Sequence, residues 1–117
     1  MFSNSFRETA LALLGVRNMS ELRRVHVVFV GQVQGVGFRW TAQATARDVG
    51  ATGWVINERD GSVTMEVQGT DTQISEFFGK FDRSYARYRI QYEIYDKYDM
   101  AIDPEETEFV VRFVGRD

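Results

Sequence analysis

The order of hydrophobic patterns along this 117-residue chain predicts an α+β fold. Segments in which apolar and polar residues alternate predict strands, and segments in which apolar residues recur every three or four positions predict helices. These segments follow one another as strand, helix, strand, strand, helix, strand and strand. This order is typical of a ferredoxin-like α/β sandwich, so we expect a mostly antiparallel sheet with two helices on one face.

The first strand and the first helix have the clearest patterns. Residues 25–30 are apolar on both faces apart from His26, as expected of a central strand. One face of the helix that follows contains the apolar residues Phe38, Ala42, Ala46 and Val49. Gly50 comes directly after this face, and glycine is a common residue at the end of a helix.

A predicted hairpin joins the second strand to the third. The pair Asp60-Gly61, which follows the second strand, is a strong indication of a hairpin turn. Apolar and polar side chains alternate along residues 62–68. We therefore expect one face of this third strand to be buried and the other to be polar.

The second helix and the last two strands complete the pattern. Thr70 and Gln73 have the spacing of a capping box, which predicts the start of a helix. The apolar stripe of this helix contains Ile74, Phe77, Phe78 and Phe81. Alternation predicts a fourth strand through Tyr88, Ile90, Tyr92 and Ile94, and a fifth through Phe109, Val111 and Phe113. Pro104, the only proline, marks the loop between these two strands.

The N-terminal residues differ from the rest of the chain. We predict an N-terminal extension, residues 1–24, that is helical or disordered, and one domain, residues 25–117. The apolar residues of the extension that fall at helical spacing are Phe6, Ala10, Leu13 and Leu14. This apolar stretch is too short for a secretory signal.

The composition excludes several classes of function. The chain has no cysteine, which rules out disulfides, thiolate zinc sites and phosphatases that form a phosphocysteine. The formal net charge of −3 argues against a protein that binds nucleic acid by neutralising phosphates. No apolar run has the length of a membrane span. We therefore expect a cytoplasmic monomer that binds neither nucleic acid nor membranes.

Residues 31–39 run from an apolar strand through a glycine-spaced loop into a helix. Gly35 and Gly37 allow backbone conformations in which successive N–H groups converge on one point. The helix start adds unpaired N–H groups, and Arg39 adds a planar guanidinium suited to phosphate oxygens. The predicted phosphate-binding residues are Gln34, Gly35, Val36, Gly37, Phe38 and Arg39. Two glycines alone are more typical of a tight turn with a surface arginine.

A second segment makes the prediction more specific. It contains Gly53-Trp54-Val55 followed by Asn57, Asp60, Gly61 and Val63. Together with Val33-Gln34-Gly35-Val36-Gly37-Phe38-Arg39, it resembles the two signatures of the acylphosphatase family, in order and in spacing. The resemblance extends from about residue 24 to residue 113. It implies the ferredoxin-like fold and an enzyme that hydrolyses a small acyl phosphate to a carboxylate and inorganic phosphate, without a metal or a cofactor.

Arg39 and Asn57 are the predicted catalytic residues. Arg39 and the nearby backbone N–H groups can hold a phosphoryl group and screen its charge. Asn57 can hydrogen-bond a water but has no useful basicity, so we expect it to orient the nucleophile. A carboxylate leaving group needs no general acid, because the pKa of its conjugate acid is about 4 to 5. The resemblance implies that the same two residues are the family's catalytic arginine and asparagine.

Several polar residues also have structural interpretations. Taken alone, Asn57 is more typical of a turn at the end of a strand. We expect Asp60 to be required by the hairpin and His26 to be a packing residue with its polar atoms satisfied. The acidic cluster, which we expect to be a solvated loop, contains Asp103, Glu105, Glu106 and Glu108.

The sequence departs from the family's usual pattern at two single positions and in one short segment. Gln32 replaces a basic residue, Thr41 replaces the second of two aromatic residues, and Arg83-Ser84-Tyr85 stands in place of a Gly-Pro turn. We expect these departures to alter the shape of the pocket more than the reaction. An alternative function remains open, a noncatalytic ferredoxin-like module that binds an anion or RNA. The third strand lacks the exposed aromatic residues of an RNA-binding sheet, which argues against RNA.

Overall fold

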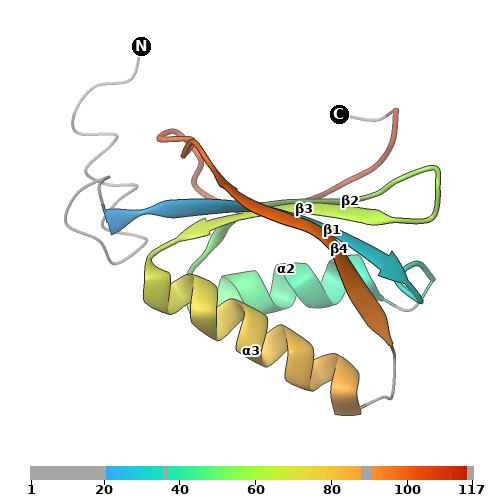
Figure 1. Ribbon diagram of the computed structural model, residues 1–117. Coiled ribbons are helices and arrows are strands. Elements are labelled where there is room, and N and C mark those ends of the chain that lie inside the picture. Colours follow the sequence, from blue (N-terminus) through green and yellow to red (C-terminus); the bar gives the residue numbers. More distant parts are fainter. Residues whose placement is uncertain (1–20, 36, 88–90, 116–117) are drawn as a thin grey trace.

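The computed structural model describes residues 21–35, 37–87 and 91–115, which form a five-stranded sheet with two helices on one face (Figure 1). The segment between the last two strands lies on the opposite side of the sheet. The predicted ferredoxin-like sandwich is thus confirmed. Of the predicted N-terminal extension, residues 1–20 lie outside the described part. The elements are β1 (Arg23–Gly31), α2 (Phe38–Val49), β2 (Thr52–Asn57), β3 (Val63–Gly69), α3 (Asp71–Arg87), β4 (Tyr92–Met100) and β5 (Phe109–Arg112).

The strands lie in the order β4-β1-β3-β2-β5. Neighbouring strands are antiparallel except β2 and β5, which run parallel. β1 lies inside the sheet between β3 and β4, as its apolar sequence predicts. The parallel pairing places Arg112 of β5 opposite Ile56 of β2, so the ends of these two strands lie side by side.

The core lies between the sheet and the helices. The residues of β1 and β3 that are buried in it are Val25, Val27, Phe29, Val63, Met65 and Val67. Phe38, the first residue of α2, packs edge-on against Phe29 and Phe81, with ring centroids 5.0 and 4.7 Å apart. Such aromatic pairs add about 0.5–1.5 kcal/mol beyond the burial of their area. The start of α2 is therefore firmly anchored in the core.

Two predicted helix ends are confirmed. Gly50 follows α2 with a left-handed backbone, φ 80°, and its N–H is directed to the carbonyls of the last turn. The N–H of Thr70 donates to Gln73 Oε1 at 2.9 Å, and the N–H of Gln73 donates to Thr70 Oγ1 at 3.1 Å, which is the predicted capping box. In the described part of the chain, no helix is both long enough and apolar enough to cross a membrane.

The fourth strand lies later in the chain than the sequence predicts. α3 continues to Arg87, and β4 begins at Tyr92 and ends at Met100. Tyr88 and Ile90, which we predicted in this strand, lie outside the described residues. β4 is an edge strand whose side chains are exposed after Tyr92. Its second half therefore lacks the apolar alternation on which the prediction relied.

The sheet face opposite the helices contains a buried ionic network. The side chain of Arg24 is only 4% exposed and donates to the carboxylates of Glu66 and Glu106, each at 2.9 Å. Glu106 also accepts a hydrogen bond from the hydroxyl of Thr52 at 2.7 Å. The prediction of a solvated acidic loop is therefore wrong for Glu106. A buried guanidinium requires charged partners, and the segment between β4 and β5 supplies one of them.

His26 lies on the same face as this network. Its Nδ1 is 2.9 Å from Glu66 Oε2, and its ring stacks on Tyr98 with the centroids 4.8 Å apart. The prediction that His26 is a satisfied packing residue is therefore confirmed.

Gly53 lies where the backbones of β2 and β3 approach closely. Its φ is 142°, and a Cβ at this position would be 1.9 Å from the carbonyl oxygen of Glu66. We expect Gly53→Ala to lower the free energy of unfolding by about 3 kcal/mol or more, because it combines backbone strain with a backbone clash. Gly61→Ala is the matched control, since Gly61 has φ 94° but open space around it. It should cost about 1–2 kcal/mol. Urea denaturation measures both free energies of unfolding, and equal losses in Gly53→Ala and Gly61→Ala would contradict the clash at Gly53.

Candidate active site

Residues from the β1–α2 loop, the start of α2 and the end of β2 surround one small cavity of about 190 Å³. Its described lining residues are Val33, Gly35, Gly37, Phe38, Arg39, Trp40 and Asn57. The two predicted catalytic residues, Arg39 and Asn57, therefore line the same space. A single water needs about 15 Å³. The cavity is large enough for a phosphoryl group together with a water.

The backbone of the loop is shaped by two glycines. Gly35 and Gly37 both have a left-handed backbone, with φ values of 77° and 74°. Gly37 is the N-cap of α2, and no side chain of the described residues caps the helix there. A Cβ at either glycine would meet no atom within 4 Å, so the space directly beside both is open. The first N–H groups of an α-helix have no partner within the helix, and such groups can bind an anion.

The predicted phosphate-binding residues have different side-chain environments. Gln34 Nε2 donates to the carbonyl oxygens of Glu58 and Ser62 at 2.8 and 2.9 Å, which ties the loop to the β2–β3 hairpin. The side chain of Phe38 is buried in the core, so only its backbone N–H can reach a ligand. Val36 lies outside the described residues. The predicted contacts of Gln34 and Phe38 thus depend on their backbone.

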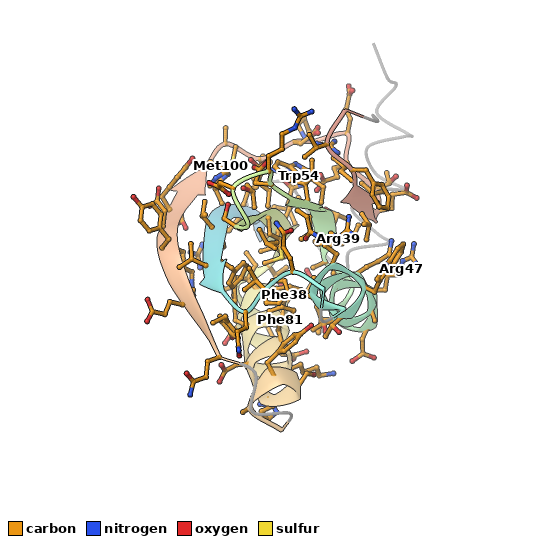
Figure 2. All side chains as sticks on the ribbon, turned by 90° about the vertical axis from the view of Figure 1, so that its right-hand side faces the viewer. Phe38, Arg39, Arg47, Trp54, Phe81 and Met100 are labelled. Carbon is orange, nitrogen blue, oxygen red and sulfur yellow. The ribbon has the colours of Figure 1, made fainter. Side chains whose placement is uncertain are left out.

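Arg39 extends from the first turn of α2 and lies between that helix and the sheet in Figure 2. Its Nη1 donates to the carbonyl oxygen of Arg112 at 3.4 Å, which is a long hydrogen bond. Its guanidinium carbon is 4.7 Å from the centre of the Phe113 ring. No carboxylate among the described residues pairs with Arg39. Most of its N–H donors therefore remain free for an anion.

Asn57 is the last residue of β2 and is half-buried. It lies two positions after Val55, a core residue, so its side chain projects from the helix-covered face of the sheet. Its Oδ1 is buried and has no hydrogen-bond partner among the described residues. A buried acceptor without a partner costs about 1–3 kcal/mol. Such an atom fits a residue that hydrogen-bonds a water or a substrate.

The carboxylates that follow Asn57 in the sequence have other partners. Glu58 Oε2 accepts a hydrogen bond from the hydroxyl of Thr64 at 2.7 Å. The hydroxyl and the backbone N–H of Ser62 donate to Asp60 Oδ1 at 2.6 and 2.9 Å, and these hydrogen bonds hold the pKa of Asp60 below its usual value. The structural interpretation of Asp60 is therefore confirmed. Among the described lining residues, Arg39 is the only ionisable one, so the cavity carries positive charge and offers no acidic or basic side chain for proton transfer.

Phe113 is a residue of this site that the sequence did not reveal. Its alternation with Phe109 and Val111 predicts only a place in the last strand. Its contact with Arg39 depends on the parallel pairing of β5 with β2, which joins segments far apart in the sequence. No local sequence pattern predicts such a contact.

We expect Phe113→Leu to lower turnover roughly two- to fivefold, because a cation–π contact worth about 0.5–1 kcal/mol no longer orients Arg39. Phe113→Tyr should retain turnover, because it retains the ring. Trp54→Leu is the control, because it removes a similar contact: the guanidinium carbon of Arg112 is 4.9 Å from the centre of the Trp54 ring. Trp54 lies on the other side of the sheet from Arg39 (Figure 2). Steady-state kinetics of the three variants would test this role. Equal losses in Phe113→Leu and Trp54→Leu would contradict it.

The fold and the cavity place this protein in one class: ferredoxin-like α/β sandwiches that have a candidate anion site between the first strand and the first helix. A family model described as Acylphosphatase matches residues 25–111. The chain belongs to the acylphosphatase family. An acylphosphatase from Oceanobacillus iheyensis is 37% identical over 92 residues, which cover 79% of this chain and 100% of the relative.

Solved structures with low sequence identity have the same fold. An acylphosphatase from Coxiella burnetii superposes with a TM-score of 0.66 at 23% identity, covering 82% of this chain and 98% of the other. HypF from T. kodakarensis superposes with a TM-score of 0.64 at 22% identity, covering 77% of this chain but only 12% of the other. The same sandwich therefore also forms a small part of a much longer protein. No finding among these favours the noncatalytic alternative.

Proposed function

We propose that this protein hydrolyses acyl phosphates to a carboxylate and inorganic phosphate, in the cavity lined by Arg39 and Asn57. The proposal is supported by membership of the acylphosphatase family and by the relatives that bear that name. The observation that carries it is the chemistry of the lining. The described lining residues include one cation and no carboxylate, histidine or cysteine.

These lining residues suit the hydrolysis of an acyl phosphate, because its leaving group needs no general acid. The leaving carboxylate is the conjugate base of an acid with a pKa of about 4 to 5, so it departs without a proton from the protein. An alkyl phosphate would require a general acid at this position. The remaining tasks are to position the phosphoryl group and to stabilise its charge.

Each task has a candidate group. Arg39 and the backbone N–H groups of the loop and the first turn of α2 hold the phosphoryl oxygens. Asn57 Oδ1 accepts a hydrogen bond from a water and directs that water at phosphorus. The new bond joins the water oxygen to phosphorus while the bond from phosphorus to the acyl oxygen breaks. The electron pair leaves with the carboxylate, and the water's proton passes to solvent or to the phosphate product.

The proposal has wider consequences. The reaction as derived requires neither a metal nor a cofactor, because positioning, charge stabilisation and leaving-group departure are all assigned. A net charge of −3 supports a protein that acts on a small molecule in preference to a nucleic acid. We also propose that the protein is cytoplasmic and acts as a monomer.

The test is the release of phosphate from acetyl phosphate in the presence of a chelator. We expect turnover in the ordinary enzymatic range of about 1–10³ s⁻¹. 4-Nitrophenyl phosphate should react far more slowly, because its leaving group is much more basic. Inorganic phosphate should inhibit competitively, because it fits the same N–H groups and Arg39. Release no faster than in buffer, or a strict requirement for added magnesium or zinc, would overturn the proposal.

A further inference from the structure

A second hollow lies between α2 and α3, directly beside the candidate active site. This groove has a volume of about 820 Å³. Trp40 lines both the groove and the small cavity. The two spaces are therefore neighbours, and the side chain of Trp40 contributes to the wall of both.

The two volumes suit different parts of a substrate. Small-molecule sites usually have volumes of about 300–1,000 Å³. The cavity, at about 190 Å³, is below this range, whereas the groove, at about 820 Å³, is within it. A phosphoryl group and its water fill the cavity, so a large acyl group must lie outside it. The groove is the adjoining space in which such a group can lie.

The charged side chains of the groove pair with one another, with one exception. Lys80 pairs with Asp48 across the groove. The hydroxyl of Thr45 donates to a backbone carbonyl of its own helix, as does that of Ser84. Arg83 has no hydrogen bond or ion pair with any residue that the structure describes. Its guanidinium is the charged group of the groove that is left for a ligand.

The position of Arg83 depends on the extended second helix. α3 runs without interruption to Arg87, through the residues that replace the Gly-Pro turn usual in the family. Arg83 therefore lies within a continuous helix and lines the groove. Trp40, which is 56% exposed, offers an aromatic surface at the other boundary of the same groove. An aromatic ring stacks on such a surface, and an anion at the far end of that ring pairs with the free guanidinium.

We infer that this groove binds the acyl part of the substrate, and that preferred substrates are acyl phosphates with an aromatic acyl group that ends in an anionic group. The inference rests on the proposed function, because the phosphoryl end must occupy the Arg39 cavity. Trp40 and Arg83 are then the residues that determine specificity.

The test compares 4-carboxybenzoyl phosphate with its uncharged analogue 4-carbamoylbenzoyl phosphate, with acetyl phosphate as the reference substrate. We expect the native protein to have a higher kcat/KM for the carboxylate, by roughly two- to fivefold, the scale of a partly exposed ion pair. In Arg83→Gln this preference should disappear. Trp40→Ala should lower kcat/KM for both aromatic substrates relative to acetyl phosphate by about two- to tenfold, as expected for the loss of an aromatic contact.

Arg47→Gln is the matched control. Arg47 also lies exposed on α2 but does not line the groove, and Figure 2 shows it on the side of α2 away from α3. This variant removes the same charge and should keep the preference for the carboxylate. Equal kcat/KM values for the two aromatic substrates in the native protein, or equal effects of Arg83→Gln and Arg47→Gln, would overturn the inference while acetyl phosphate is still hydrolysed. Failure to hydrolyse any of the three substrates would instead refute the proposed function.

Discussion

Arg39→Ala should reduce kcat on the order of 10³-fold or more, the scale on which an arginine stabilises phosphoryl transfer. The change removes the only cation among the described residues that line the cavity. The inhibition constant of inorganic phosphate should also rise, by about tenfold or more, because hydrogen bonds to charged groups contribute about 1.5–3 kcal/mol each. Steady-state kinetics with phosphate as the inhibitor would measure both effects.

Controls for the Arg39→Ala variant distinguish a loss of catalysis from a loss of stability. The side chain makes one long hydrogen bond and one ring contact within the described structure, so its loss should change the free energy of unfolding by about 1 kcal/mol or less. Arg39→Lys should rescue turnover poorly, since a point charge cannot reproduce the bidentate guanidinium. Arg47→Ala, on the same helix but outside the cavity, should retain activity. Full activity of Arg39→Lys would show that charge alone suffices.

Asn57→Ala should produce a different pattern. We expect kcat to fall on the order of 10²-fold, as when one preorganised hydrogen-bonding group is removed from an active site. Phosphate inhibition should change little, because Arg39 and the loop N–H groups remain. Stability should not fall, because the buried Oδ1 has no partner to lose among the described residues. Kinetics, phosphate inhibition and urea denaturation of this one variant test all three expectations.

The two variants are most informative together. Arg39→Ala should impair binding and turnover, whereas Asn57→Ala should impair turnover alone. If Asn57→Ala abolished phosphate inhibition but retained kcat at saturating substrate, its assigned role would be wrong. Asn57 would then belong to the phosphate-binding groups.

Local patterns predict those parts of the fold in which one face of an element is buried. The helix end at Gly50 and the capping box of Thr70 and Gln73 were predictable because each is formed by residues close together in the sequence. β4 was misplaced because an edge strand with exposed side chains carries no apolar alternation. Glu106 was misinterpreted because its partner, Arg24, lies at the opposite end of the chain.

The site, too, combines features that short sequence motifs predict with features that depend on residues far apart in the sequence. Arg39 and Asn57 could be proposed from two short motifs, and both line one cavity. The role of the Gln34 side chain, which joins the loop to the hairpin, has no signature in the sequence. The contact of Phe113 with Arg39 depends on the pairing of β5 with β2. The groove between α2 and α3 depends on how the two helices pack, which the sequence does not specify directly.

The proposed mechanism has a water attack phosphorus while the cavity holds the phosphoryl group. Hydrolysis of benzoyl phosphate in water labelled with ¹⁸O shows which atom the water attacks, with mass spectrometry of both products and an uncatalysed reaction as the control. We expect a single labelled oxygen in each inorganic phosphate and none in benzoate. Label in benzoate would mean that water attacks the carbonyl carbon, and the roles proposed for Arg39 and Asn57 would be wrong.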